Sequence, residues 1–102
     1  MAKEIILYNL KDSVTDEEYA DYVKNEKGPL LESLSSAQKF ELVKITGAAS
    51  GKIPYRYVGI LHLKSLEDFY QKDAPSPKFQ GFLEKWKTKV AEFHILSGEE
   101  IY

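Results

Sequence analysis

The segment Pro54–Leu63 (PYRYVGILHL) constrains the fold more than any other part of the chain. It is rich in aromatic and β-branched residues and alternates with a period of two, which is typical of a β-strand. Alternation groups one side as Tyr55, Tyr57, Gly59, Leu61 and Leu63, and the other side as Arg56, Val58, Ile60 and His62. Because both sides carry apolar residues, we expect this strand to be covered on both faces of its sheet.

Three further strands are predicted, at Glu4–Leu10, Lys39–Thr46 and Glu92–Leu96. Between the first two, Thr15 and Glu18 form a capping box that starts a helix. Gly28-Pro29 is expected to kink or interrupt that helix, because proline removes a backbone donor.

A second helical region follows the central strand and is predicted in two pieces. Ser65 is a suitable N-cap for the first piece, and the segment Asp73–Pro77 interrupts it. Ser76 then caps a second piece, with Pro77 at the first helical position. The apolar stripe of this piece faces the core and consists of Phe79, Phe82, Leu83, Trp86 and Val90.

The order strand, helix, strand, strand, helix, strand predicts a ferredoxin-like α+β fold. Its four-stranded antiparallel sheet carries two helices on one face. The chain of 102 residues is long enough for a single domain over residues 1–102 with one core. A homodimer in which two sheets pack face to face would cover the other apolar face.

Composition excludes several classes of function. The chain has no cysteine, which excludes disulfides, thiol nucleophiles and thiolate metal sites. A net charge of −2 argues against a nucleic-acid or membrane-surface partner. The first apolar run is too short for a signal peptide and no segment is long enough to span a membrane, so we expect a cytoplasmic protein. We expect no cofactor and no metal, because phosphate-loop and metal-ligand spacings are missing.

The strand order also resembles that of the RNA-recognition motif. Ile5–Leu10 and Tyr55–Val58 stand where that family has its two signature strands. However, Ile6 replaces a stacking aromatic residue, and Ile53-Pro54 replaces a basic residue followed by glycine. Half of the stacking platform and the basic surface are therefore missing, which leaves RNA binding as a weak alternative.

A second resemblance covers nearly the whole chain. It rests on four short motifs in order, namely Leu7–Leu10, Gly28-Pro29-Leu30, Phe40–Val43 with Thr46-Gly47, and Pro54–Val58. On these motifs the chain resembles the dimeric α/β-barrel superfamily. Within it, the chain is similar to the REDY-like group associated with prodigiosin-type pigment biosynthesis, and more loosely to the EthD-like group.

This resemblance implies a homodimer closed through its sheets and a pocket in each subunit between helices and sheet. Members of the superfamily include cofactor-free enzymes, haem-handling enzymes and proteins without a known reaction, so the fold does not settle the function. Two hypotheses follow. The chain is either a cofactor-independent enzyme acting on an aromatic or polyketide-like metabolite, or a non-catalytic accessory protein that binds such a ligand.

Lys27 stands where EthD-like relatives commonly have a histidine, just before Gly28-Pro29. It is either a cation that holds a phenolate or carboxylate at the pocket mouth, or an exposed lysine near a helix C-terminus. His62 is the candidate proton-transfer residue, because alternation places it on the side assigned to the helices; the alternative is a structural histidine bonded to a backbone carbonyl. Arg56 shares that side and either binds an anion or pairs with a surface carboxylate. His94 is expected on the dimer side.

Large aromatic side chains are the remaining ligand-binding candidates. At strand and helix spacing they serve mostly as core residues. A pocket lined by some of them would nevertheless suit a flat, conjugated ligand, and those residues are Tyr22, Phe69, Phe82 and Trp86.

Overall fold

The computed structural model describes residues 2–102, and its elements follow the predicted order. The strands are β1 (Ala2–Leu10), β2 (Ala37–Lys44), β3 (Tyr57–Leu63) and β4 (Val90–Glu99). The α-helices are α1 (Asp16–Tyr22), α2 (Gly28–Glu32), α3 (Leu66–Asp68) and α4 (Pro77–Lys87). Two π-helical turns complete the helical regions, η1 (Val23–Lys27) and η2 (Phe69–Asp73).

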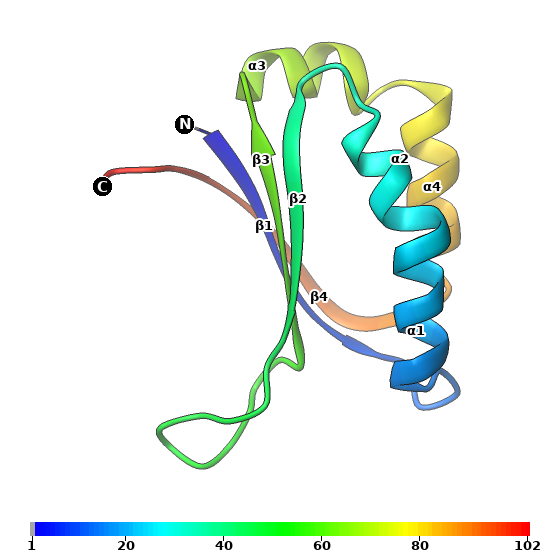
Figure 1. Ribbon diagram of the computed structural model, residues 1–102, viewed down its shortest axis with the longest axis vertical. Coiled ribbons are helices and arrows are strands. Elements are labelled where there is room, and N and C mark those ends of the chain that lie inside the picture. The colour runs from blue at the N-terminus through cyan, green and yellow to red at the C-terminus, as the bar shows by residue number, and fades with distance from the viewer. Residues whose placement is uncertain (1) are drawn as a thin grey trace.

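The four strands form one antiparallel sheet in the order β2-β3-β1-β4. In the middle of β1, Ile5 lies opposite Ile60 of β3 and opposite Leu96 of β4. The helices lie on one side of this sheet, and the other side is open (Figure 1). The predicted ferredoxin-like α+β fold is confirmed.

Hydroxyl groups cap the helices where the sequence predicts helix starts. The Thr15 hydroxyl accepts a hydrogen bond from the Glu18 N–H at 3.1 Å. Ser65 and Ser76 accept in the same way, from Asp68 at 3.1 Å and from Phe79 at 3.2 Å. These bonds satisfy backbone donors that the first turn of a helix cannot satisfy itself.

The break predicted at Gly28-Pro29 takes the form of a π-helical turn. The N–H of Gly28 donates to the carbonyl oxygen of Val23, five residues earlier. A Cβ atom at Gly28 would lie 3.0 Å from that oxygen, so glycine allows the close approach. Pro29, which has no N–H to donate, then stands in the first turn of α2.

A similar turn ends the first piece of the second helical region. There the N–H of Ala74 donates to the carbonyl oxygen of Phe69 at 2.8 Å, which closes η2. Both helical regions on the sheet therefore contain a π-helical turn. Such turns are rare in proteins and are often found at functional sites.

The core lies between the sheet and the helices, in two clusters. One is mainly aliphatic and consists of Ala2, Leu31, Leu34, Ala37, Leu61, Leu63 and Phe69. The other is mainly aromatic and consists of Tyr8, Tyr19, Tyr22, Tyr57, Trp86 and Val90. Both clusters take residues from β3, and all of those residues belong to the same side of the strand.

This arrangement corrects the predicted orientation of β3. Arg56, Val58, Ile60 and His62 were predicted to face the helices, and that prediction was wrong. The residues of β3 buried beneath the helices are Tyr57, Gly59, Leu61 and Leu63. Alternation correctly sorted the residues into two sides, but with apolar residues on both it could not show which side the helices cover.

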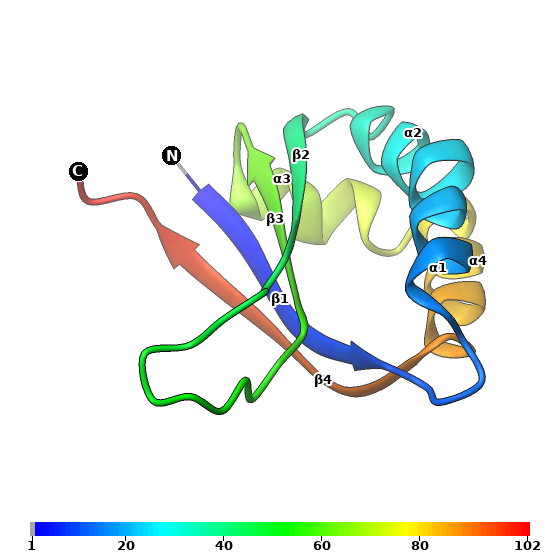
Figure 2. The ribbon, with the colours of Figure 1, turned by 60° about the horizontal axis from the view of Figure 1, so that its bottom comes forward.

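The open face of the sheet is partly apolar. Ile5, Ile60 and Leu96 stand side by side on it, and Leu96 is 48% exposed. His94 lies opposite Leu7 on the same face, as predicted. The connection between β2 and β3, residues 45–56, extends away from the helices (Figure 2).

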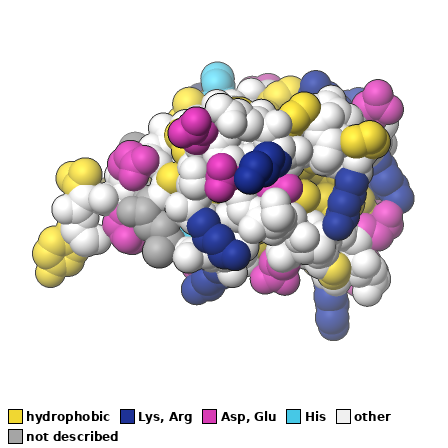
Figure 3. Space-filling view, turned by 90° about the horizontal axis from the view of Figure 1, so that it is seen from above, with side chains coloured by type: hydrophobic (Ala, Val, Ile, Leu, Met, Phe, Trp, Pro, Cys, Tyr) yellow, Lys and Arg dark blue, Asp and Glu magenta, His cyan; other side chains and the backbone are white. Residues whose placement is uncertain are grey.

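The C-terminal residues Ile101 and Tyr102 are fully exposed, and hydrophobic side chains are seen on the projection at one end of the molecule (Figure 3). Among the helices of residues 2–102, none has the length and apolar character needed to cross a membrane.

Candidate functional site

A cavity of about 260 Å³ lies between the sheet and the helices. Most of its wall is apolar, formed by Ile6, Leu31, Phe40, Leu61, Phe69, Ala74, Phe79, Phe82, Leu83, Trp86 and Ile95. The polar side chains in the wall are Glu4, Lys27, Tyr70 and Gln80. An apolar cavity with a few polar groups is the usual form of a small-molecule site.

Lys27 is the basic residue of this wall. Its side chain is almost completely buried, with the residue 4% exposed. Its Nζ donates hydrogen bonds to the hydroxyl oxygens of Tyr8 at 3.1 Å and Tyr19 at 3.0 Å. Within residues 2–102, no carboxylate forms an ion pair with it. The alternative of an exposed surface lysine is therefore wrong.

Aromatic rings surround the Lys27 ammonium. Nζ lies 4.9 Å from the ring centre of Tyr8 and 5.6 Å from that of Tyr19. The ring centres of Phe40 and Trp86 are 5.3 Å and 5.2 Å away. These cation–π contacts stabilise the charged form in part, but they do not replace a counter-ion.

Burial lowers the pKa of Lys27 from its ordinary value of 10.5 to about 7. Burial also raises the pKa of Tyr8, and that of Tyr19 to about 12, so both phenols are neutral near pH 7. Lys27 consequently exists in both protonation states near neutral pH. It can donate a charged hydrogen bond, or act as a neutral amine that accepts a proton.

The π-helical turn η1 explains why Lys27 faces inward. A π-helical turn holds one more residue per hydrogen-bonded ring than an α-helical turn, which shifts the following residues around the helix axis. Lys24, in the same turn, is exposed, whereas Lys27 at its end is buried. The turn therefore places one lysine in solvent and one in the cavity.

The two tyrosine hydroxyls have partners besides Lys27. They lie 2.6 Å apart, within hydrogen-bonding distance of each other. The indole N–H of Trp86 also donates to the Tyr19 hydroxyl at 3.0 Å. Tyr8 stacks on Tyr57 with ring centres 5.6 Å apart, which fixes its position on the sheet. The two tyrosine hydroxyls therefore keep hydrogen-bond partners that do not depend on Lys27.

A second polar group of the cavity wall lies on β1 and was not predicted as a site residue from the sequence. Glu4 is 2% exposed, and its Oε1 accepts hydrogen bonds from the hydroxyls of Tyr70 and Ser97, the latter at 3.0 Å. Glu4 shares the helix-facing side of β1 with Ile6 and Tyr8. In the sequence, Glu4, Ile6 and Tyr8 are alternate residues of the predicted strand, and this spacing was the available signal that Glu4 faces inward.

The cavity contains four of the predicted ligand-binding residues, namely Lys27, Phe69, Phe82 and Trp86. Tyr22 does not line it. That residue packs in the aromatic cluster, with its ring centre 5.8 Å from that of Tyr19.

His62 and Arg56 also lie outside the cavity. The Nε2 atom of His62 lies 2.5 Å from Oε1 of Glu41, on the open face of the sheet. Arg56 is exposed just before β3, and its backbone N–H donates to Asn9 at 2.8 Å. The catalytic role predicted for His62 stays a prediction, but the cavity does not support it because β3 turns that side chain the other way.

The family model of the "REDY-like protein HapK" matches residues 2–101. The chain belongs to this family. No curated protein matches the chain closely enough to count as similar.

Solved structures share the fold at low sequence identity. HapK from Hahella chejuensis is 21% identical with a TM-score of 0.78, over 99% of this chain and 93% of that one. Hydroxynitrile lyase from Passiflora edulis is 14% identical with a TM-score of 0.81, over 99% and 95%. A dimeric ferredoxin-like protein of unknown function from Thermobifida fusca is 16% identical with a TM-score of 0.74, over 97% and 90%.

Proposed function

We propose that this REDY-like protein binds a small, largely apolar aromatic metabolite in the cavity and holds a carbonyl, phenolate or carboxylate group of that ligand on Lys27. The observation that carries the proposal is a buried lysine in an otherwise apolar cavity, without a carboxylate partner in residues 2–102. A buried cation normally has a counter-ion, so a ligand is the natural partner here.

The hydrogen-bonding capacity of Lys27 supports this proposal. An ammonium group has three donors, and Tyr8 and Tyr19 account for two of them. The third is open for a ligand oxygen. A charge-assisted hydrogen bond in a site without water is stronger than a neutral one, so this contact would orient the ligand.

Lys27 also supports an enzymatic form of the proposal. A lysine with a pKa of about 7 can give or take a proton at neutral pH without a cofactor. It would then do the work of the histidine that EthD-like relatives commonly have. A hydroxynitrile lyase has the same fold, which supports an enzymatic role. The resemblance to the REDY-like group, which is associated with prodigiosin-type pigment biosynthesis, supports a prodigiosin-type or polyketide-like metabolite as the ligand class.

The second candidate, a non-catalytic accessory protein, uses the same site without turnover. Native mass spectrometry of freshly purified protein tests the shared part of both candidates. We expect a co-purified metabolite on the wild type and none on Lys27→Met. Lys24→Met, which changes the exposed lysine of the same π-helical turn, should keep the metabolite. Equal occupancy in all three proteins would contradict the proposal.

We also propose that the open face of the sheet is the interface of a homodimer. Its apolar stripe of Ile5, Ile60 and Leu96 supports this proposal, as does the dimeric ferredoxin-like neighbour. His62 and Glu41 would then lie at or near the interface. Sedimentation of the wild type should show a dimer at micromolar concentration, and Ile60→Asp should shift it to a monomer. A monomeric wild type would overturn the proposal.

A further inference from the structure

We propose that the cavity selects ligands with two polar ends, an acceptor or anionic group for Lys27 and a hydrogen-bond donor, an O–H or N–H, for Glu4. This inference rests on the proposed ligand site at Lys27 and adds a second recognition point to it. It follows from the state of the Glu4 carboxylate, because one of its oxygens has partners and the other has none.

The partnered oxygen of Glu4 is Oε1. It accepts hydrogen bonds from the hydroxyls of Tyr70 and Ser97, which are themselves 2.8 Å apart. Tyr70 comes from the π-helical turn η2 and Ser97 from β4, so two separate elements fix the carboxylate. This arrangement leaves Oε2 as the oxygen without a partner.

The Oε2 atom of Glu4 is buried and has no hydrogen-bond partner in the described part of the chain. Buried polar atoms nearly always have a partner, because removing them from water without one is unfavourable. Such an atom in a cavity wall points to a missing donor. No residue of the described part of the chain provides that donor, so we assign it to a ligand.

Glu4 and Lys27 stand at different ends of the cavity wall. Glu4, Ile6 and Tyr8 follow one another on the helix-facing side of β1, and Lys27 bonds to the hydroxyl of Tyr8. At a strand rise of about 3.4 Å per residue, the Cα atoms of Glu4 and Tyr8 are about 14 Å apart. Ile6 and the apolar wall occupy the interval.

The two ends also have opposite hydrogen-bonding character. Lys27 can only donate when it is charged, and a carboxylate can only accept. They do not form an ion pair with each other in this structure. A ligand with an acceptor at one end, a donor at the other and an apolar ring system between them satisfies both residues at once. A purely apolar ligand would leave both unsatisfied.

Calorimetry on the full-length protein with three related compounds tests this inference. The compounds are 6-hydroxy-2-naphthoic acid, 6-methoxy-2-naphthoic acid and 2-naphthoic acid, measured at pH 6, where Lys27 is protonated. All three offer a carboxylate to Lys27, and only the first offers an O–H to Glu4. We expect the hydroxy compound to bind the wild type about tenfold more tightly than the other two. A second pair, 4′-hydroxybiphenyl-4-carboxylic acid and biphenyl-4-carboxylic acid, tests a greater distance between the carboxylate and the hydroxyl.

Glu4→Gln tests whether the tighter binding of the hydroxy compounds depends on Glu4. The substitution keeps the shape and can keep an acceptor for Tyr70 and Ser97, but it replaces one carboxylate oxygen by a donor. We expect the hydroxy compounds to lose their advantage in this variant. Glu84→Gln, which changes an exposed acid of α4 outside the cavity, should preserve it. Circular dichroism checks that both variants are folded.

The possible outcomes separate this inference from the proposed function. If neither hydroxy compound has an advantage in the wild type, the role of Glu4 is overturned without any need for a variant. If the advantage persists in folded Glu4→Gln, it is overturned as well. In both cases, loss of binding of all the acids in Lys27→Met would leave the proposed function standing. If none of the compounds binds the wild type, both proposals fail.

Discussion

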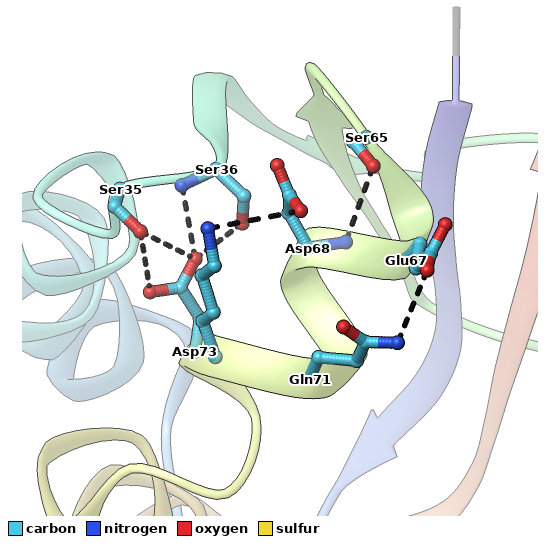
Figure 4. A network of polar contacts seen from close by, with 8 residues as sticks. Ser35, Ser36, Ser65, Glu67, Asp68, Gln71 and Asp73 are labelled. Atoms are coloured by element: carbon cyan, nitrogen blue, oxygen red, sulfur yellow. Dashed lines mark hydrogen bonds and ion pairs between the residues drawn. The ribbon is translucent and has the colours of Figure 1, made fainter.

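Two buried, ionisable residues end the two π-helical turns of this protein, and they have opposite surroundings. Asp73 ends η2 and is 8% exposed. It accepts hydrogen bonds from the N–H and hydroxyl of Ser36 and from the hydroxyl of Ser35 (Figure 4). Lys27 ends η1, donates to two neutral tyrosines and lines the cavity.

The pKa values of the two residues express this difference. Burial acts to raise the pKa of Asp73, but hydrogen bonds from Ser36 and Ser35 outweigh it and lower the pKa below its ordinary value. For Lys27, burial is the sole cause, and it lowers the pKa to about 7. Asp73 is thus stabilised in its charged form, whereas Lys27 is destabilised in its charged form.

A structural charge and a functional charge differ in whether their hydrogen bonds are already made. The carboxylate of Asp73 links the α2–β2 connection to η2 with its hydrogen bonds already made. Lys27 keeps a donor free in a cavity and lowers the stability of the free protein when it is protonated. Residues that reduce stability but remain at a site are typical of function.

The largest expected effect is the pH dependence of stability that Lys27 causes. Its folded pKa lies below its unfolded one, so between pH 7 and 10 the unfolded state binds more protons, and the free energy of unfolding rises with pH. We expect the wild type to gain about 3 kcal/mol relative to Lys27→Met between pH 7 and 9.5. Urea unfolding across this range measures it. Parallel profiles for the two proteins would contradict the lowered pKa.

The next effect is the loss of the Asp73 hydrogen bonds. Asp73→Ala leaves the Ser36 N–H without its acceptor, so we expect the free energy of unfolding to fall by about 2 kcal/mol at pH 7. Because the pKa of Asp73 is lowered, its contribution is present above its unfolded pKa and disappears as pH falls through the folded pKa. Asp12→Ala, at an exposed turn, is the control and should change little.

Lys27 and Asp73 should also differ in their effect on ligand binding. We expect Lys27→Met to weaken binding of 2-naphthoic acid at least about tenfold at pH 6, because it removes the charged donor. Its stability should not fall, since Tyr8 and Tyr19 keep each other as partners. Calorimetry and thermal melting measure the two quantities. If Lys27→Met unfolds more easily and still binds 2-naphthoic acid, the roles assigned to Lys27 and Asp73 are contradicted.

The smallest expected effect concerns the hydrogen bond that Ser35 donates to Asp73. The Ser35 hydroxyl lies 3.1 Å from Oδ1 of Asp73, while Ser36 supplies the remaining donors. We expect Ser35→Ala to lower the free energy of unfolding by about 1 kcal/mol, less than Asp73→Ala. Denaturant unfolding at pH 7 measures the difference. An equal loss in the two variants would mean that the group acts as one unit rather than as separate bonds.

Local sequence signals determined the strands, the helix starts and their order. Thr15, Ser65 and Ser76 cap helices because a side-chain oxygen followed by a helix-forming run acts over a few residues. That order was sufficient for the ferredoxin-like fold, and the short motifs were sufficient for the REDY-like family. These features depend on neighbouring residues, which a sequence shows directly.

The tertiary structure alone decided which residues meet at the cavity. Alternation divides β3 into two sides, but only packing against the helices decides that Leu61 faces them and His62 does not. The π-helical turn η1 turns Lys27 inward, and residue spacing for an ordinary α-helix does not predict that shift. Glu4 meets Tyr70 and Ser97 across the fold, 66 and 93 residues away, because burial brings them together.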